Sequence, residues 1–208
     1  MPTRIKICGI TRIEDALAAA RLGTDAIGLV FWPQSARAVM PARAREIVAA
    51  LPPFVSSVGV YVDPEAEWVE QTASVAGLNL LQFHGDESPE FCSQFSLPYI
   101  KAVRVKAGVD LLQYATRYSS ARGLLLDTYV EGTPGGTGDA FNWSLIPQRL
   151  PLPLILSGGL HPGNVTTAIK QVQPWAVDVS SGVEAAKGIK DAEKIAAFMQ
   201  GVRNSESL

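Results

Sequence analysis

The stretch RIKICGIT, residues 4–11, reads as a short strand that stops on a cysteine and a glycine and then leads into a helix. Its alternating isoleucines are typical of a strand. Thr11 and Glu14 have the spacing of a capping box, so the helix is expected to begin directly after Thr11. Cys8 is therefore predicted to lie at the carboxyl end of a strand. In parallel α/β proteins that end of the sheet collects ligands and reactive side chains.

Apolar runs of strand length recur along the whole chain. The predicted strands after the first are 25–31, 55–62, 78–83, 99–105, 123–127, 154–156 and 176–179. Strict alternation with helices favours a parallel sheet, and eight strand-then-helix units favour closure into a barrel. We therefore predict an α/β fold in which residues 1–208 form a single (β/α)8 TIM barrel domain. An open sheet with fewer strands is the main alternative, because short apolar runs are easily misassigned.

Two further helix starts are indicated by a capping residue followed by proline. Asp63-Pro64 and Ser88-Pro89 each place a side-chain acceptor before a proline at the first helical position. Gly23 is expected to close the first helix, since glycine readily adopts the left-handed conformation that ends helices.

The composition excludes several classes of partner. The 208 residues include 18 Lys and Arg and 20 Asp and Glu, a net charge of −2 that offers no basic surface to nucleic acid. The 2 cysteines are far apart and lack metal-ligand spacing, which favours a reducing compartment without disulfides. No apolar run reaches membrane-spanning length, and no secretory signal is visible. We expect a cytoplasmic protein with no metal and with no nucleic-acid or membrane partner.

Two turns late in the chain give the clearest binding signal. Ser157-Gly158-Gly159 follows the seventh predicted strand, and Ser180-Ser181-Gly182 follows the eighth. Adjacent strand ends of a barrel commonly build a phosphate site from backbone amides, and glycine lets an anion approach the backbone. Glycines that only make tight turns are the alternative. Two such turns on neighbouring strands, both with serine hydroxyls, favour a phosphate ligand.

Cys8 and Asp127 end the first and sixth predicted strands, so a closed barrel would point both into one mouth. A thiolate can act as a base, and a carboxyl group kept protonated in a partly desolvated site can act as an acid. The alternatives are a small buried hydrophobe for Cys8 and a loop-pinning carboxylate for Asp127. Simple burial fits Cys92 better, since it lies in the amphipathic segment 91–95.

Arg37 and His84 are the remaining candidates for the mouth. Arg37 follows the second strand, where its planar guanidinium would suit a substrate carboxylate; a solvated surface charge is the alternative. His84 follows the fourth strand and could donate to a substrate oxygen or merely pin its own loop. His161 is expected to cap the seventh helix. No dinucleotide or Walker-type fingerprint is present, so no cofactor is expected.

Seven segments fit one known pattern when they are taken together and in order: KICGIT (6–11), FWPQSAR (31–37), QFHGDE (82–87), LLDT (125–128), GGTG (135–138), SGGL (157–160) and VDVSSGVE (177–184). Each segment is weak alone, but the ordered set is specific. On these segments the chain resembles the phosphoribosylanthranilate isomerase family, cofactor-free enzymes of tryptophan biosynthesis.

The resemblance implies a barrel that converts N-(5-phosphoribosyl)anthranilate to 1-(2-carboxyphenylamino)-1-deoxyribulose 5-phosphate by an Amadori rearrangement. It makes Asp127 the general acid that protonates the furanose ring oxygen and Cys8 the general base that removes the C2′ proton. The small-molecule phosphosugar would be held by a substrate-binding set consisting of Arg37, His84, Gly158, Gly159, Asp178, Ser180, Ser181 and Gly182. The sequence leaves monomer and homodimer open.

Three residues depart from the family pattern, namely Phe83, His161 and Asp139. The connection 128–142 is expected to close over the substrate as a lid. A related phosphosugar isomerase of histidine biosynthesis is a second interpretation, disfavoured because those enzymes resemble a pattern with carboxylates at both catalytic strand ends. A phosphate-binding barrel without catalysis is a third, and it leaves both catalytic candidates unexplained.

Overall fold

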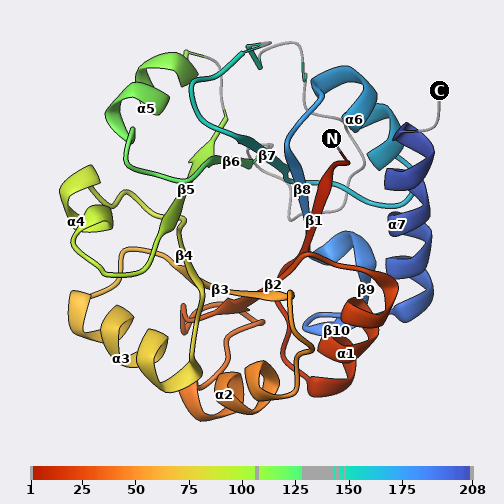
Figure 1. Ribbon diagram of the computed structural model, residues 1–208, viewed down its shortest axis with the longest axis horizontal. Coiled ribbons are helices and arrows are strands. Elements are labelled where there is room, and N and C mark those ends of the chain that lie inside the picture. The colour runs from red at the N-terminus through yellow and green to blue at the C-terminus, as the bar shows by residue number, and fades with distance from the viewer. Residues whose placement is uncertain (1, 106–107, 128–142, 144–145, 148, 207–208) are drawn as a thin grey trace.

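The computed structural model describes the chain except for residues 1, 106–107, 128–142, 144–145, 148 and 207–208. Eight parallel strands close into a barrel in sequence order, with β8 beside β1 (Figure 1). The predicted barrel is confirmed and the open sheet is wrong. The strands are β1 (Arg4–Ile7), β2 (Ala26–Val30), β3 (Ser56–Tyr61), β4 (Leu80–Phe83), β5 (Tyr99–Arg104), β6 (Leu124–Asp127), β7 (Leu154–Ser157) and β8 (Ala176–Val179).

The described helices lie outside the ring of strands (Figure 1). They are α1 (Ile13–Leu22), α2 (Pro41–Ala49), α3 (Ala66–Ala76), α4 (Pro89–Ser93), α5 (Leu111–Arg117), α6 (Val165–Val172) and α7 (Ala192–Glu206). Most of the connection between β6 and β7 lies outside the described residues, including the predicted lid 128–142 and Asp139. None of the described helices has both the length and the apolar character that crossing a bilayer requires.

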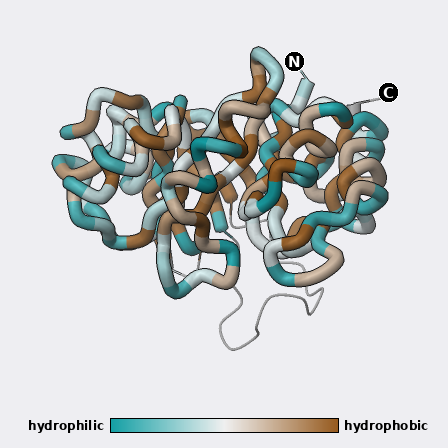
Figure 2. Tube along the Cα trace, turned by 90° about the horizontal axis from the view of Figure 1, so that it is seen from below, coloured by the Kyte–Doolittle hydropathy of each residue, from teal (hydrophilic) through white to brown (hydrophobic). Residues whose placement is uncertain are grey.

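Strand β1 shows how an alternating sequence builds two layers of packing. Ile5 and Ile7 join the large core cluster between the barrel and its helices. Lys6 and Cys8 point the other way, into the barrel, because successive side chains of a strand face opposite sides. Hydrophobic and hydrophilic residues are interspersed along the outer helices, as Figure 2 shows, which is typical of helices with one apolar face.

The predicted capping box at the start of α1 is wrong. The helix begins at Ile13 after Arg12, and no side chain caps its first amides. The Thr11 hydroxyl instead donates to the carbonyl of Gly188, far along the chain. A tertiary acceptor thus replaces the local one. Gly23 ends the helix with φ +101°, the left-handed conformation that was expected.

The helix start predicted at Asp63 is also wrong, whereas Ser88 caps α4 as predicted. Asp63 has φ +44°, and its carboxylate accepts from the amide of Asp86 at 2.7 Å. The residue therefore fastens the β3 connection to the β4 connection, and α3 begins three residues later at Ala66.

A short hairpin between β8 and α7 was not predicted. A single turn of 3-10 helix, η2 (Ser181–Val183), leads into β9 (Glu184–Ala186), which pairs antiparallel with β10 (Ile189–Lys190). The hairpin packs near the start of α1, where the Gly188 carbonyl meets Thr11. Three- and two-residue strands fall below the length at which alternation is detectable in a sequence.

Candidate active site at the carboxyl end of the barrel

Cys8 directly follows β1 and faces the barrel interior, where it packs with Val30 and Val60. It is 9% exposed, so its place at a strand end is as predicted, and its burial also fits the alternative of a small hydrophobe. Burial raises the pKa of the Cys8 thiol, and the ammonium of Lys6 acts in the opposite direction. The pKa of the Cys8 thiol therefore depends on Lys6, two residues before it.

Lys6 and Asp178 form a buried ion pair inside the barrel. The Lys6 ammonium lies 2.9 Å from the Asp178 carboxylate, and the two residues face each other across the β1–β8 pairing. The hydroxyl of Ser157 donates to the same carboxylate at 3.4 Å. Asp178, which the sequence assigned to substrate binding, is thus only 4% exposed and is held by protein groups. Lys6 was missed, although its spacing of two from Cys8 places both side chains on one face of a strand.

Asp127 and His84 meet at the mouth. Asp127 is the last residue of β6, and its Oδ2 lies 3.1 Å from Nε2 of His84, which follows β4. The other ring nitrogen of His84 lies 3.0 Å from the side-chain amide nitrogen of Gln82. Both Asp127 and His84 are partly exposed, with side-chain exposures of 28% and 21%. The histidine predicted to contact substrate therefore contacts the predicted acid as well.

A buried ion pair fixes the turn that carries His84. Glu87 accepts from Lys101 at 2.9 Å and from the amides of Asp63 and Gly85. The Lys101 ammonium also donates to the carbonyls of Phe83 and Gly85, on either side of His84. This network determines the path of the backbone through His84.

We expect Lys101→Met to lower the free energy of unfolding by about 3 kcal/mol, because it leaves the Glu87 carboxylate buried without its cation. Urea unfolding with an unchanged m-value measures the loss. The double variant Lys101→Met/Glu87→Gln, which leaves no orphan charge, should be more stable than the single one. As a matched control, Arg4→Gln removes a half-exposed ion pair and should cost less than about 1 kcal/mol. Equal losses from Lys101→Met and Arg4→Gln would contradict the assignment.

Arg37 lies against the hairpin instead of projecting freely. Its Nε and one terminal nitrogen each lie 2.7 Å from a carboxylate oxygen of Glu184, a bidentate pair that raises the pKa of the guanidinium. Lys190 approaches the same carboxylate at 3.0 Å. Gly9 makes the approach possible: it has φ +74°, and a Cβ there would lie 2.5 Å from Cδ of Arg37 and 3.0 Å from Oγ of Ser180. The end of β1, Arg37 and the turn after β8 therefore converge.

Glu184 and Lys190 were not predicted as site residues. Glu184 closes the segment 177–184 that was quoted above, which is the only signal the sequence offers. Lys190 donates to the carbonyl of Ser180 at 3.0 Å, so it also holds the turn after β8. Glu184 thus holds Arg37, and Lys190 connects Glu184 to the turn at Ser180.

The two glycine turns adjoin each other. Gly158 and Gly159 both have positive φ, of +81° and +63°, and a Cβ added at Gly159 would meet open space. At Gly182 an added Cβ would overlap the carbonyl oxygen of Leu160, so this glycine is required by close packing of the second turn on the first. Ser181 opens η2 beside it. The arrangement brings both halves of the predicted anion site together at the mouth.

The predicted cap at His161 is wrong in detail. Asn164 precedes α6, and the carbonyl of His161 accepts from the amides of Asn164 and Val165. The imidazole accepts from the amide of Gly163 at 3.1 Å. His161 therefore shapes the turn before the helix through its backbone and ring without being the capping residue.

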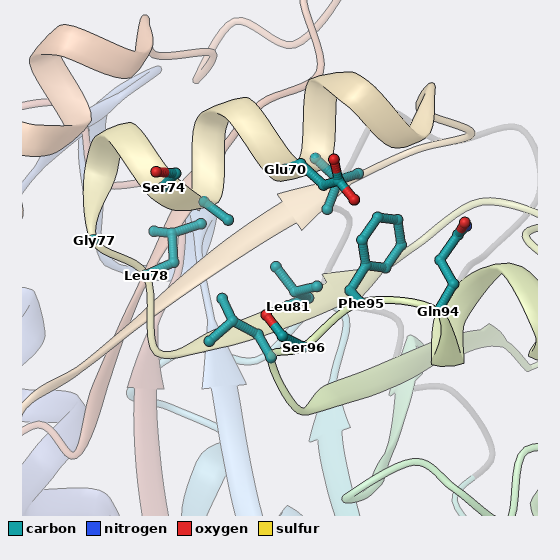
Figure 3. Close-up of a pocket in the computed structure, with 11 residues that line it drawn as sticks. Glu70, Ser74, Gly77, Leu78, Leu81, Gln94, Phe95 and Ser96 are labelled. Carbon is teal, nitrogen blue, oxygen red and sulfur yellow. The ribbon is translucent and has the colours of Figure 1, made fainter.

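Two features of the described residues outside the mouth bear on the choice of site. The described residues hold no group of three His, Cys, Asp or Glu side chains able to bind a metal ion. A cavity of about 530 Å³ lies on the outer side of the barrel between α3 and the segment after α4 (Figure 3). Leu78, Leu81 and Phe95 line it, with Glu70 and Gln94 at its edge, and it contains none of the predicted site residues.

Comparison with known proteins gives a consistent result. The family model described as N-(5'phosphoribosyl)anthranilate (PRA) isomerase matches residues 5–201. An N-(5'-phosphoribosyl)anthranilate isomerase from Nitrosospira multiformis is 76% identical over 208 residues, which is all of both chains. The crystal structure of phosphoribosyl anthranilate isomerase from Thermotoga maritima has a TM-score of 0.90 and 45% identity, over 97% of this chain and 99% of that one. A structure of such an isomerase in complex with reduced 1-(o-carboxyphenylamino)-1-deoxyribulose 5-phosphate has a TM-score of 0.86 and 43% identity, over 97% and 99% of the two chains.

Proposed function

The chain belongs to the N-(5′-phosphoribosyl)anthranilate isomerase family of tryptophan biosynthesis, and from this we propose that Cys8 and Asp127 carry out an Amadori rearrangement at the barrel mouth. The observation that carries the proposal is that the closed parallel barrel gathers the ends of β1 and β6 at one mouth. An acid and a base on different strands can then act on neighbouring atoms of one sugar. We take N-(5′-phosphoribosyl)anthranilate as the substrate because the relatives carry its name.

The proposed reaction moves protons and requires no cofactor. Asp127, in its protonated form, gives a proton to the furanose ring oxygen, the C1′–O bond breaks, and the anthranilate nitrogen forms a protonated Schiff base with C1′. The Cys8 thiolate then removes the C2′ proton, which gives an enolamine. Tautomerisation of the enolamine gives the ketone, so C2′ is oxidised and C1′ reduced within one molecule. Each transfer is of the kind for which positioned side chains contribute about 10²- to 10⁴-fold.

His84 supports the acid as a hydrogen-bond donor. The side-chain amide of Gln82 donates to Nδ1, so the ring carries its proton on Nε2. Nε2 donates to Oδ2 of Asp127 and leaves the acidic proton on the other oxygen. The 3.1 Å contact thus fixes the direction in which Asp127 presents its proton.

The two ends of the substrate have separate anchors in this proposal. The anthranilate carboxylate binds to the guanidinium face of Arg37 that Glu184 leaves free, since Glu184 engages Nε and one terminal nitrogen. The phosphate binds at the adjoining turns of Gly158-Gly159 and Ser180-Ser181-Gly182. Anchoring both ends places C1′ and C2′ between acid and base, and this fixed orientation lowers the activation barrier.

A fluorescence assay tests the function directly. Freshly generated N-(5′-phosphoribosyl)anthranilate is added to the full chain without metal or nucleotide, and its fluorescence is followed as it is consumed. We expect turnover by the parent chain. Turnover only of an aminoimidazole carboxamide ribotide would instead assign the chain to the histidine-type reaction, and binding of phosphosugars without turnover would make it a non-catalytic barrel.

The proposal also covers the location, the ligand and the oligomeric state of the protein. We propose a cytoplasmic enzyme whose only ligand is the small phosphosugar, acting as a monomer or a homodimer. Light scattering at assay concentration distinguishes the two states, and either is compatible with a mouth formed entirely by one chain.

A further inference from the structure

The ion pair beneath Cys8 contains two residues that transfer no proton in the proposed reaction. Lys6 and Asp178 are 6% and 4% exposed, and their charged atoms lie 2.9 Å apart. A buried ion pair is weak evidence for stability, because lost hydration offsets the attraction between the charges. A separate cluster of buried residues on β5 to β8 consists of apolar side chains such as Ile100, Leu125 and Ile155, which pack there without any charge. Stability therefore does not explain why two charged residues are buried inside the barrel.

The geometry relates this pair to the thiol. Lys6 and Cys8 lie on the same face of β1, and Gly28 of β2 lies beside both of them. A Cβ at Gly28 would come within 2.7 Å of the Cys8 sulfur and 3.2 Å of Cε of Lys6. The missing side chain leaves a space that the thiol and the end of the lysine stem share. The Lys6 ammonium interacts with both the Asp178 carboxylate and the Cys8 sulfur.

We propose that Lys6 is a positioning residue that keeps Cys8 able to act as a thiolate base, and that Asp178 sets how much of the lysine charge the sulfur receives. The inference rests on the proposed function in one respect: it assumes that Cys8 must lose its proton to act. Lys6 itself touches no reacting atom.

The charges around the sulfur have opposing effects. Burial raises the pKa of Cys8, Lys6 lowers it, Asp178 raises it and Lys190 lowers it. Arg37, from the connection after β2, is the other charged group that interacts with the thiol. Burial alone would lower the pKa of Lys6, but Asp178 and Cys8 together raise it above the ordinary value, so the ammonium keeps its proton. A permanent cation beside the sulfur offsets the cost of a buried thiolate.

Alkylation by iodoacetamide as a function of pH tests the inference without substrate. The full chain carries Cys92→Ala, so that Cys8 is the sole thiol. For Asp178→Asn, which frees the whole lysine charge for the sulfur, we expect the midpoint of the alkylation curve to fall by about one pH unit. For Lys6→Met/Asp178→Asn, which removes the cation without leaving an orphan carboxylate, we expect it to rise by about one unit. At pH 7.5 the double variant should react about 10-fold more slowly.

The opposite directions of the two shifts separate this role from a structural one, since a pair that only filled space would move neither midpoint. Lys6→Met alone is avoided because it strands the buried Asp178 carboxylate. Asp178→Asn leaves the Lys6 ammonium the Cys8 sulfur as a partner, and circular dichroism checks that each variant is folded. Arg4→Gln is the matched control: it removes a cation from the same strand at a half-exposed position and should leave the midpoint unchanged. An unchanged midpoint in Asp178→Asn, or an upward shift, would overturn the inference.

The pH dependence of kcat/KM is measured on the same variants. If its acidic limb follows the alkylation midpoint, both the positioning role and the base assignment hold. If the alkylation midpoints move as expected but the rate profile does not, Lys6 tunes the thiol and the assignment of Cys8 as the base fails. The two proposals can therefore fail separately.

Discussion

Cys8→Ala should reduce turnover of N-(5′-phosphoribosyl)anthranilate by about 10²-fold or more while the affinity for an open-chain product analogue stays within about threefold. The sulfur is the group that removes the C2′ proton in the proposed reaction. It makes no polar contact that the alanine methyl would leave unsatisfied, apart from its approach to Lys6. The measurement pairs kcat from the fluorescence assay with the dissociation constant of reduced 1-(o-carboxyphenylamino)-1-deoxyribulose 5-phosphate.

Cys92→Ala is the matched control, because it removes the other thiol from a fully buried position on α4. Burial raises the pKa of Cys92 to about 12, so this thiol is no base at neutral pH. We expect lower stability but normal kcat in the folded fraction. Near-normal kcat in Cys8→Ala would show that Cys8 is the small buried hydrophobe of the alternative interpretation.

The barrel was predictable because its signals are local and repeated. A strand is recognised from side chains that face alternately into and out of the barrel over a few residues, as in residues 4–7. A helix end such as Gly23 is recognised from the preference of glycine for the left-handed conformation. The prediction failed where a capping side chain instead bonds to a residue that is distant in the sequence. Thr11 donates to Gly188, and Asp63 joins two neighbouring connections, so neither caps a helix.

The positions of the candidate residues in the fold were predictable, but their charged partners were not. The strand ends place Cys8 and Asp127 from the sequence alone. Lys6, in contrast, is a charged residue in a strand, and its partner lies 172 residues away. Arg37 and Glu184 are separated by 147 residues. Charges of this kind are indistinguishable from solvated ones until the closed barrel makes β1 and β8 neighbours, which is a consequence of the whole fold.

The same dependence on closure explains why the roles of the glycines differ. Gly158 and Gly159 have backbone conformations that a turn requires, and this is visible in a sequence as a glycine pair. Gly182 is required because the carbonyl of Leu160 lies against it. A tight-turn interpretation and a phosphate interpretation are therefore compatible here, since both turns keep their glycines for reasons of geometry and lie directly against each other.

Asp127→Asn should also reduce kcat by about 10²-fold or more, because the amide cannot deliver a proton to the furanose oxygen. The amide has nearly the same shape and can still bond to His84, so the fold and the loop should persist. The open-chain product analogue has no furanose ring. Its dissociation constant should therefore stay within about threefold, whereas kcat/KM for the cyclic substrate falls together with kcat.

A matched variant separates loss of the acid from loss of a loop anchor. His84→Gln removes the partner of Asp127 but keeps the carboxyl group, so kcat should fall only about 10-fold. If His84→Gln and Asp127→Asn reduce kcat equally, the acid lies elsewhere and Asp127 only pins its loop. If Asp127→Asn costs about tenfold more than His84→Gln, the carboxyl group at the end of β6 is the proton donor, and His84 serves to aim it.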